Sequence, residues 1–216
     1  MSIIVERFNK IKSNIVSLKT IKPVNIIAVS KTFPLEHIYP LIEYGHIHYG
    51  ENKVQEASAK WAEQKKNNQN LKLHMIGKLQ SNKAKDAVKI FDYIHSLDSQ
   101  KLADALAKHQ TNLNKQIEYF IQVNIGNEIQ KSGIPVNELD SFYNYCINEI
   151  NLRIIGLMVI PPNDNKPERY FKTLNELNKS LGLKNLSMGM SADYIEAIKH
   201  GSNYVRIGSS IFGVRS

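Results

Sequence analysis

A lysine that directly follows an apolar, β-rich run is the first residue with clear chemical potential. Residues 25–30 read NIIAVS, and Lys31 comes at the end of this predicted strand. Apolar surroundings disfavour the charged form of an ammonium group, so part of the Lys31 amine would be unprotonated and able to attack an aldehyde. Most lysines at strand ends are solvated loop residues, so the local context of Lys31 alone does not define a site.

Two turns near the end of the chain favour a bound phosphate. LSMGMS (186–191) ends in Ser191, a candidate N-cap for the helix predicted after it, and VRIGSSIFG (205–213) places Gly208 and Ser209 after a predicted strand. Hydroxyl groups, unpaired backbone N–H groups and the helix dipole all favour an anion at such positions. Ordinary capping and tight turns would produce the same pattern.

One arginine lies inside the last predicted strand. Arg206 stands two residues before Gly208. An arginine at this position either points into the mouth of a barrel or forms a structural ion pair. Because its charge is permanent, a pyridine nitrogen facing it would stay unprotonated.

Polar residues also stand near the ends of other predicted strands. Two of them, His48 and His74, invite a metal-site interpretation, but they lie on different strands and no H-E-x-x-H motif occurs. We therefore interpret both histidines as polar lining of the barrel mouth and expect no metal ion. The others are Asn52, the segment KLQSNK (78–83), Asn124, Glu128 and Lys131.

Eight β-rich runs alternate with helical segments along the chain. The runs contain mostly Ile, Val, Tyr and Leu with little alternation, as expected for strands buried on both faces. The predicted strands are residues 25–30, 46–50, 71–77, 92–97, 116–125, 152–160, 185–189 and 203–208. The predicted helices are residues 2–19, 35–44, 51–66, 81–88, 99–110, 136–149, 166–181 and 192–200.

This alternation predicts an α/β protein with a single-domain (β/α)8 TIM barrel over residues 1–216 and an extra N-terminal helix. An open doubly wound sheet is the alternative, but no G-x-G-x-x-G follows the first strand. In such barrels, functional residues lie at the C-terminal ends of strands, and phosphate often binds near the seventh and eighth strands. Lys31, Ser191 and Gly208 occupy positions of this kind.

The chain has a formal net charge of +8. Its lysines are scattered along predicted helices without a recognition motif, so a solvated surface is a better interpretation than nucleic-acid binding. A positive field would still attract an anionic phosphate ligand. No run of about 18 apolar residues is present, which excludes a membrane-spanning helix.

Cysteine usage and the N-terminus indicate the cytoplasm. The single cysteine, Cys146, cannot form an internal disulfide, and its apolar neighbours at helical spacing favour a core position over a nucleophile. The first 19 residues mix charges with apolar positions and do not resemble a secretory signal.

Six motifs, in order along nearly the whole chain, resemble the pyridoxal 5′-phosphate (PLP) homeostasis protein family, also called the YggS/PROSC family. The longest covers residues 186–213, so the resemblance is specific. The motifs are AVSK (28–31), YGENKVQE (49–56), HMIGKLQSNK (74–83), VNIGNEIQKSG (123–133), GLMVIP (156–161) and LSMGMSADYIEAI..GS..VRIGSSIFG (186–213).

The resemblance implies the fold of the N-terminal barrel of alanine racemase, with PLP as the cofactor. Lys31 would form the internal aldimine, and Arg206 would face the pyridine nitrogen. Ser191, Gly208 and Ser209 would hold the phosphate, with Ser209 where threonine is more usual in the family. The implied cofactor-binding residues are Lys31, Asn52, Ser191, Arg206, Gly208 and Ser209.

Two functional classes fit a PLP–lysine barrel: an enzyme such as an amino-acid racemase, and a protein that holds the cofactor. Catalysis of the alanine racemase type needs a second base, a tyrosine on an additional β-domain from a partner subunit, and we expect no such domain here. The resemblance implies a PLP-binding protein of PLP homeostasis, without catalytic residues or turnover, that buffers PLP or delivers it to PLP-dependent apoenzymes. We expect a cytoplasmic monomer that binds neither nucleic acid nor membrane.

Overall fold

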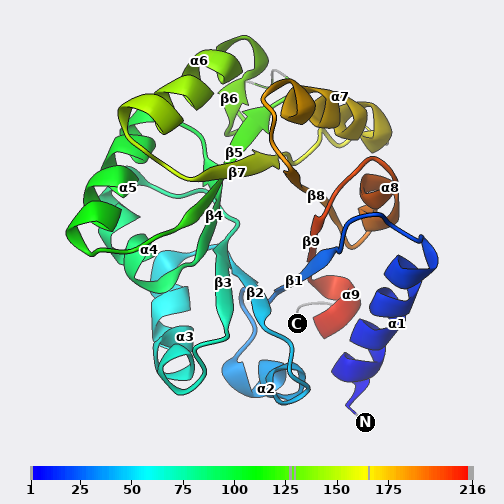
Figure 1. The fold of residues 1–216 in the computed structure, drawn as a ribbon. Helices are drawn as coiled ribbons and strands as arrows, with labels where there is room; N and C mark the ends of the chain where they lie inside the picture. Colours follow the sequence, from blue (N-terminus) through cyan, green and yellow to red (C-terminus); the bar gives the residue numbers. More distant parts are fainter. Residues whose placement is uncertain (1, 127, 129, 165, 214–216) are drawn as a thin grey trace.

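The computed structural model describes residues 2–213 except 127, 129 and 165. Its strands form a closed parallel barrel in the order β1, β2, β3, β4, β5, β7, β8 and β9, with β9 paired to β1 (Figure 1). This confirms the predicted (β/α)8 barrel and all eight predicted strands. The strands are β1 (Asn25–Val29), β2 (His48–Glu51), β3 (Lys72–Met75), β4 (Tyr93–Leu97), β5 (Glu118–Asn124), β7 (Ile154–Met158), β8 (Asn185–Met190) and β9 (Tyr204–Ile207). A two-residue strand, β6 (Ile134–Pro135), pairs with β5 outside the ring.

Helices surround the barrel, and their bounds largely follow the prediction. The helix expected at 51–66 begins only at Val54, because β2 extends to Glu51. The one expected at 136–149 is divided into a 3-10 turn, α6 and a π-helical turn. The helices are α1 (Ile3–Ser17), α2 (Leu35–Glu43), α3 (Val54–Asn67), α4 (Ala84–Ile90), α5 (Gln100–Asn112), α6 (Leu139–Asn144), α7 (Pro167–Ser180), α8 (Tyr194–Lys199) and α9 (Ser209–Phe212).

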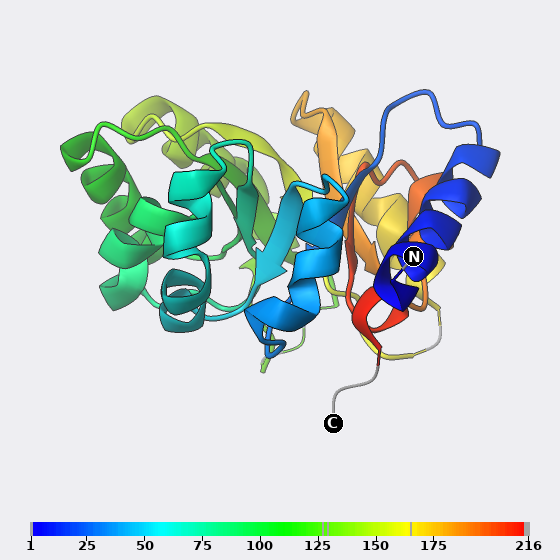
Figure 2. The ribbon, with the colours of Figure 1, turned by 90° about the horizontal axis from the view of Figure 1, so that it is seen from below.

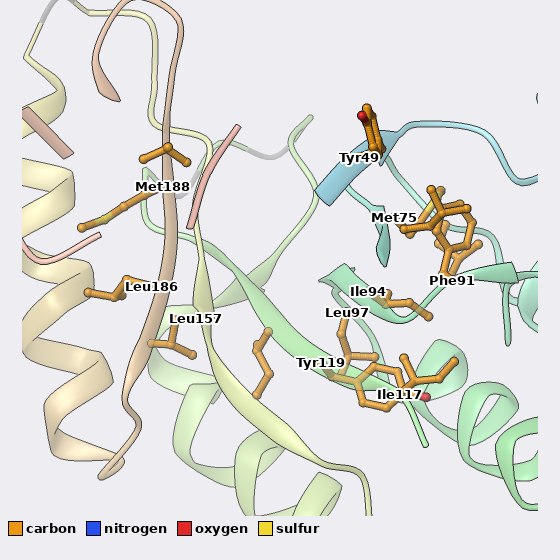
Figure 3. Packing of buried hydrophobic residues seen from close by; sticks show 14 of the residues in the cluster. Tyr49, Met75, Phe91, Ile94, Leu97, Ile117, Tyr119, Leu157, Leu186 and Met188 are labelled. Atoms are coloured by element: carbon orange, nitrogen blue, oxygen red, sulfur yellow. The ribbon is translucent and has the colours of Figure 1, made fainter. Parts of the chain in front are cut away.

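The outer faces of the strands form the main hydrophobic core with the helices. Successive strand residues point to opposite sides of a barrel, so every second side chain faces outward. Tyr119, Leu157 and Leu186 do so, and they belong to one continuous buried cluster with Trp61 of α3 (Figure 3 shows part of it). Cys146 is buried in the same cluster, which confirms it as a core residue.

The alternate strand residues fill the barrel interior, which is only partly apolar. Ile27, Phe120, Met158 and Tyr204 form a separate small cluster there. Four other strand residues that face the barrel interior are polar, and all four are buried: His74, His95, Ser187 and Arg206. The barrel therefore holds a polar column inside an apolar shell.

The two ends of the described chain meet on one side of the barrel. α1 precedes β1 as the expected extra helix and lies beside α9 (Figure 2). Motif residues Asn127 and Ile129, together with Asn165 and positions 1 and 214–216 of the predicted domain, lie outside the described residues. Within the described part of the chain, no helix is long and apolar enough to cross a membrane.

Candidate functional site

A cavity of about 860 Å³ opens at the C-terminal ends of the strands. Parallel strands that end at one edge bring their following loops together, so residues far apart in sequence meet there. All six residues expected to bind the cofactor line this cavity. They are Lys31, Asn52, Ser191, Arg206, Gly208 and Ser209.

The backbone on both sides of Lys31 is held in place by α3. Lys60 Nζ donates to the Ser30 carbonyl at 2.9 Å, and the Thr32 N–H donates to Glu56 Oε1 at 2.6 Å. Thr32 has a φ of 69°, an uncommon left-handed conformation that this second bond helps to hold. Lys31 itself is half-buried at the cavity wall. Its position is therefore determined by side chains from another element.

A buried carboxylate supports the same turn. Glu51 is fully buried, and its Oε1 accepts hydrogen bonds from Ser30 Oγ (2.7 Å), Trp61 Nε1 (2.9 Å) and Lys60 Nζ (3.0 Å). A buried charge needs such partners, because leaving water costs several kcal/mol for each ion. The motif 49–56 thus supplies both acidic anchors of the Lys31 turn. The sequence places Glu51 in that motif, but Lys60 as its partner could not be predicted from spacing alone.

The lack of a side chain at Gly77 lets Asn52 lie close to the cavity. A Cβ added to Gly77 would lie 2.6 Å from the Asn52 carbonyl oxygen, closer than real contacts allow. Glycine at this position lets the loops after β2 and β3 touch, with Asn52 on one and Lys78 on the other at the cavity wall. The remainder of the segment 78–83 leads into the 3-10 turn Ser81–Lys83.

Arg206 lies at the floor of the cavity and is anchored by oxygen atoms. Its Nη1 donates to the Ser187 carbonyl and to Ser187 Oγ, both at 2.7 Å, and its Nη2 donates to the Val159 carbonyl at 2.9 Å. Burial lowers the pKa of Arg206 to about 10, so the guanidinium is still charged at neutral pH. Of the two alternatives for this residue, the structure favours the barrel mouth: among the described residues, Arg206 forms no ion pair.

Ser191 connects the ends of β8 and β9. Its Oγ accepts hydrogen bonds from the backbone N–H groups of Gly208 (3.3 Å) and Ser210 (3.4 Å). The expectation that Ser191 caps the following helix is wrong, because α8 begins only at Tyr194 and the Ser191 hydroxyl bonds to the other turn. The two serine turns are therefore in contact, with Ser209 exposed beside them.

His48 and His74 do not lie where the sequence analysis placed them. Neither lines the cavity at the barrel mouth; His74 is fully buried within the barrel, and His48 lines a different cavity at the N-terminal ends of the strands. The physical reason is strand register: His48 is the first residue of β2, at its N-terminal end, and the His74 side chain of β3 is buried in the barrel interior. Among the described residues, no group of three or more His, Cys, Asp or Glu side chains is placed to hold a metal ion.

The rest of the cavity wall is mainly neutral and cationic. Lys131 forms an ion pair with Glu128 at 2.6 Å, and Lys78 is exposed at the rim. Strand β5 contributes the polar side chains of Gln122 and Asn124 to the wall. An amine, a buried guanidinium, a hydroxyl and turn amides in one cavity fit a phosphorylated aromatic aldehyde such as PLP.

Comparisons with known proteins define the class of barrel. The family model for the alanine racemase N-terminal domain matches residues 7–216, and the chain belongs to that family. An alanine racemase from Clostridium difficile shares the fold, with a TM-score of 0.73 at 15% identity, and this chain covers 56% of that one.

Closer relatives narrow the family further. The pyridoxal phosphate homeostasis protein of Pasteurella multocida is 40% identical over 202 residues, which are 89% of this chain and 87% of that protein. The chain belongs to the pyridoxal phosphate homeostasis protein family. The structure of PipY from Synechococcus elongatus, which has PLP bound, matches with a TM-score of 0.86 and 34% identity, covering 97% of this chain and 100% of that one.

Proposed function

We propose that this chain binds PLP covalently through Lys31 and takes part in PLP homeostasis by buffering the cofactor or delivering it to PLP-dependent apoenzymes. One observation carries the proposal: Lys31, Arg206 and the Ser191–Gly208 turn pair line one cavity. The PLP bound to PipY and the names of the curated relatives support the same choice of ligand.

Each polar group has a distinct task in this proposal. Lys31 would hold the cofactor through its aldehyde carbon, with the aldehyde oxygen leaving as water, and Ser191, Gly208 and Ser209 would hold the phosphate through hydroxyl and backbone N–H groups. Asn52 lines the cavity on the loop after β2 and would lie near the cofactor. The positive charge of Arg206 keeps the pyridine nitrogen unprotonated. Bound PLP supplies an electron-withdrawing ring, and an unprotonated nitrogen makes that ring a weaker electron sink.

The lining of the cavity favours a holding role over an enzymatic one. Racemisation needs a second acid–base group on the face opposite the lysine. Among the described residues that line the cavity there is no tyrosine, histidine or cysteine, and its acidic side chain, Glu128, is paired with Lys131. We propose that residues 1–216 act as one cytoplasmic, monomeric barrel domain without turnover.

Visible absorbance tests this function. Titrating the wild-type protein with PLP should produce a new band with a stoichiometry of one, which Lys31→Ala abolishes and Lys78→Ala retains. Lys78 is the matched control because it lines the same cavity. Loss of the band in both variants, or in neither, would contradict a specific bond to Lys31.

A second measurement separates carrier from enzyme. The loaded protein should restore the activity of a PLP-dependent apoenzyme, and it should not exchange the α-proton of common amino acids with solvent deuterium. Exchange at even a few turnovers per second would establish the racemase-like alternative.

A further inference from the structure

A hydrogen-bonded chain of side chains runs through the barrel interior and ends at Arg206. His48 Nδ1 lies 2.9 Å from His74 Nε2, and His74 Nδ1 lies 2.9 Å from His95 Nε2. His95 Nδ1 lies 2.8 Å from Ser187 Oγ, which in turn lies 2.7 Å from Arg206 Nη1. Four strands other than β9 contribute to it, and the sequence analysis identified neither His95 nor Ser187 as a member.

This hydrogen-bonded chain of side chains joins the two ends of the barrel. Arg206 lines the large cavity at the C-terminal ends of the strands. His48, at the start of β2, is half-buried and lines a second cavity of about 420 Å³ between α1 and the N-terminal ends of β1 and β2. His74 and His95, between them, are fully buried.

Aromatic neighbours fix the planes of the two buried imidazoles. The His74 ring stacks on Tyr93 with centroids 4.3 Å apart and an interplanar angle of 9°. The His95 ring stacks on Phe120 at 4.3 Å and 18°. Stacking therefore keeps the ring nitrogens of His74 and His95 directed at their hydrogen-bond partners and prevents free rotation of the rings.

At pH 7.5 the neutral form of all three imidazoles predominates, because each pKa lies below the ordinary value of 6.5. Burial is the main cause, and it lowers the pKa of His48 and holds the pKa of His74 and His95 well below the usual value. The Arg206 charge lowers the pKa of His95 further. A neutral imidazole carries one N–H, so each ring can donate in one direction along the chain only.

Arg206 determines that direction. A guanidinium can only donate, so Ser187 Oγ must accept from Arg206 Nη1. The single Ser187 proton then has His95 Nδ1 as its acceptor. His95 must carry its proton on Nε2 and donate to His74, and His74 must carry its own on Nε2 and donate to His48. The opposite arrangement would leave the buried Ser187 hydroxyl proton without a partner, which is unfavourable.

We propose that His48, His74, His95 and Ser187 form a positioning chain that holds Arg206 in its orientation toward the cavity and fixes each histidine as the Nε2–H tautomer. Ser187 touches Arg206 directly, and the histidines act through Ser187. The effect on the ligand rests on the proposed PLP site, whereas the assignment of the histidine tautomers does not depend on that site. Changes at the N-terminal face of the barrel are thereby linked to the group that faces the cofactor ring.

Long-range ¹H–¹⁵N NMR of the full chain labelled in histidine tests the chain without any ligand. His48, His74 and His95 should each appear as a single Nε2–H tautomer. An Nδ1–H form at His74 or His95 would overturn the proposal. This result does not depend on PLP binding, so it stands or fails separately from the proposed function.

His95→Phe tests the positioning role. Phenylalanine retains a ring to stack on Phe120 but removes both hydrogen bonds of residue 95. His74 should then lose its fixed tautomer, and the absorbance maximum of bound PLP should shift, with affinity falling several-fold. His46→Gln is the control: the His46 ring bonds to the backbone carbonyl of His48 rather than to a side chain of the hydrogen-bonded chain, so this variant should leave both properties unchanged.

Two outcomes would overturn the role of the chain. One is a His95→Phe protein in which His74 has lost its fixed tautomer but PLP binds with wild-type affinity and a wild-type spectrum. The hydrogen-bonded chain would then be purely structural. The other is an equal spectral shift in His46→Gln, which would indicate general disturbance of the barrel. If His95→Phe does not fold, Ser187→Ala provides the same comparison: it leaves the Arg206 bonds to the carbonyls of Ser187 and Val159 and should release the His95 tautomer.

Discussion

The Ser191 hydroxyl oxygen accepts a hydrogen bond from the backbone N–H of Gly208 across 3.3 Å. This contact joins the turns after β8 and β9, and its length is at the outer limit for an N–H···O bond. A phosphate oxygen carries more negative charge than a hydroxyl and is the stronger acceptor for the same N–H group. We expect phosphate to take over this N–H and the Ser191 hydroxyl to donate to it.

Ser191→Ala should weaken PLP binding by about tenfold to a hundredfold, because one hydrogen bond to a charged group contributes roughly 1.5–3 kcal/mol. Equilibrium dialysis or absorbance titration measures the effect. Ser180→Ala, at the exposed end of α7, should leave affinity unchanged. Equal affinities for wild type and Ser191→Ala would exclude Ser191 from the phosphate site.

Gly189→Ala should destabilise the fold by about 2–4 kcal/mol, through steric overlap and backbone strain together. Gly189 has a φ of 91°, and a Cβ would lie 2.5 Å from the Ala197 Cβ and 2.9 Å from the Tyr194 Cα of α8. Gly182→Ala is the matched control, since φ is 67° there but nothing lies within 4 Å of its Cβ. Its cost should be only about 1 kcal/mol. Urea unfolding measures the free energy of unfolding that each variant loses, and equal losses for Gly189→Ala and Gly182→Ala would contradict this account.

Lys60→Met should destabilise the protein by about 3–5 kcal/mol, because it leaves the buried Glu51 carboxylate without its cation. Adding Glu51→Gln should recover part of the loss, since a neutral amide no longer needs a counter-charge. Lys89→Met, which breaks an exposed pair with Asp86, should cost less than about 1 kcal/mol. Urea unfolding distinguishes these cases, and equal losses for Lys60→Met and Lys89→Met would show that Glu51 does not depend on Lys60.

Stability should decrease as the pH falls below about 6.5, the pKa of an unperturbed histidine. Burial lowers the pKa of His48, His74 and His95 and brings the pKa of His46 to about 4, so the unfolded chain binds protons that the folded chain does not. Each such histidine contributes a slope of at most about 1.4 kcal/mol per pH unit.

Urea unfolding at pH 7.5 and pH 5.5 measures this dependence before most carboxylates of the unfolded chain titrate. His46→Gln should reduce the slope by the share of one histidine, because burial lowers the pKa of His46 to about 4. A free energy of unfolding that is the same at both pH values would contradict the neutral state of the buried histidines.

The barrel and the members of its cavity could be predicted from the sequence because both depend on local patterns. Each buried strand is a short run of apolar residues, and the residue after a strand must lie at the C-terminal edge, so the local pattern predicts the place of Lys31. Its role as the lysine that binds PLP comes from the resemblance to the family. Ser191 lines the cavity, but the helix-capping partner expected for it is wrong, because its contact with the Gly208 turn is made across two strands.

The barrel interior could not be predicted in the same way. Which residues of a strand face inward depends on where the strand begins, and a shift of one residue moves a side chain to the other face. This is why His48 and His74 were assigned to the mouth and His95 was overlooked. The Lys60–Glu51 pair was likewise missed, because the rotation of α3 against β2 determines it.

Mass spectrometry after borohydride reduction tests the central claim most directly. Borohydride fixes a PLP group on the amine to which it is bound, and proteolysis then locates the modified lysine. We predict one pyridoxyl group per chain on Lys31 at stoichiometric PLP, with Lys78 and Lys131 of the same cavity unmodified. Modification at either of those lysines instead, or an unmodified Lys31 after incubation with PLP, would contradict the assignment of Lys31 as the residue that holds the cofactor.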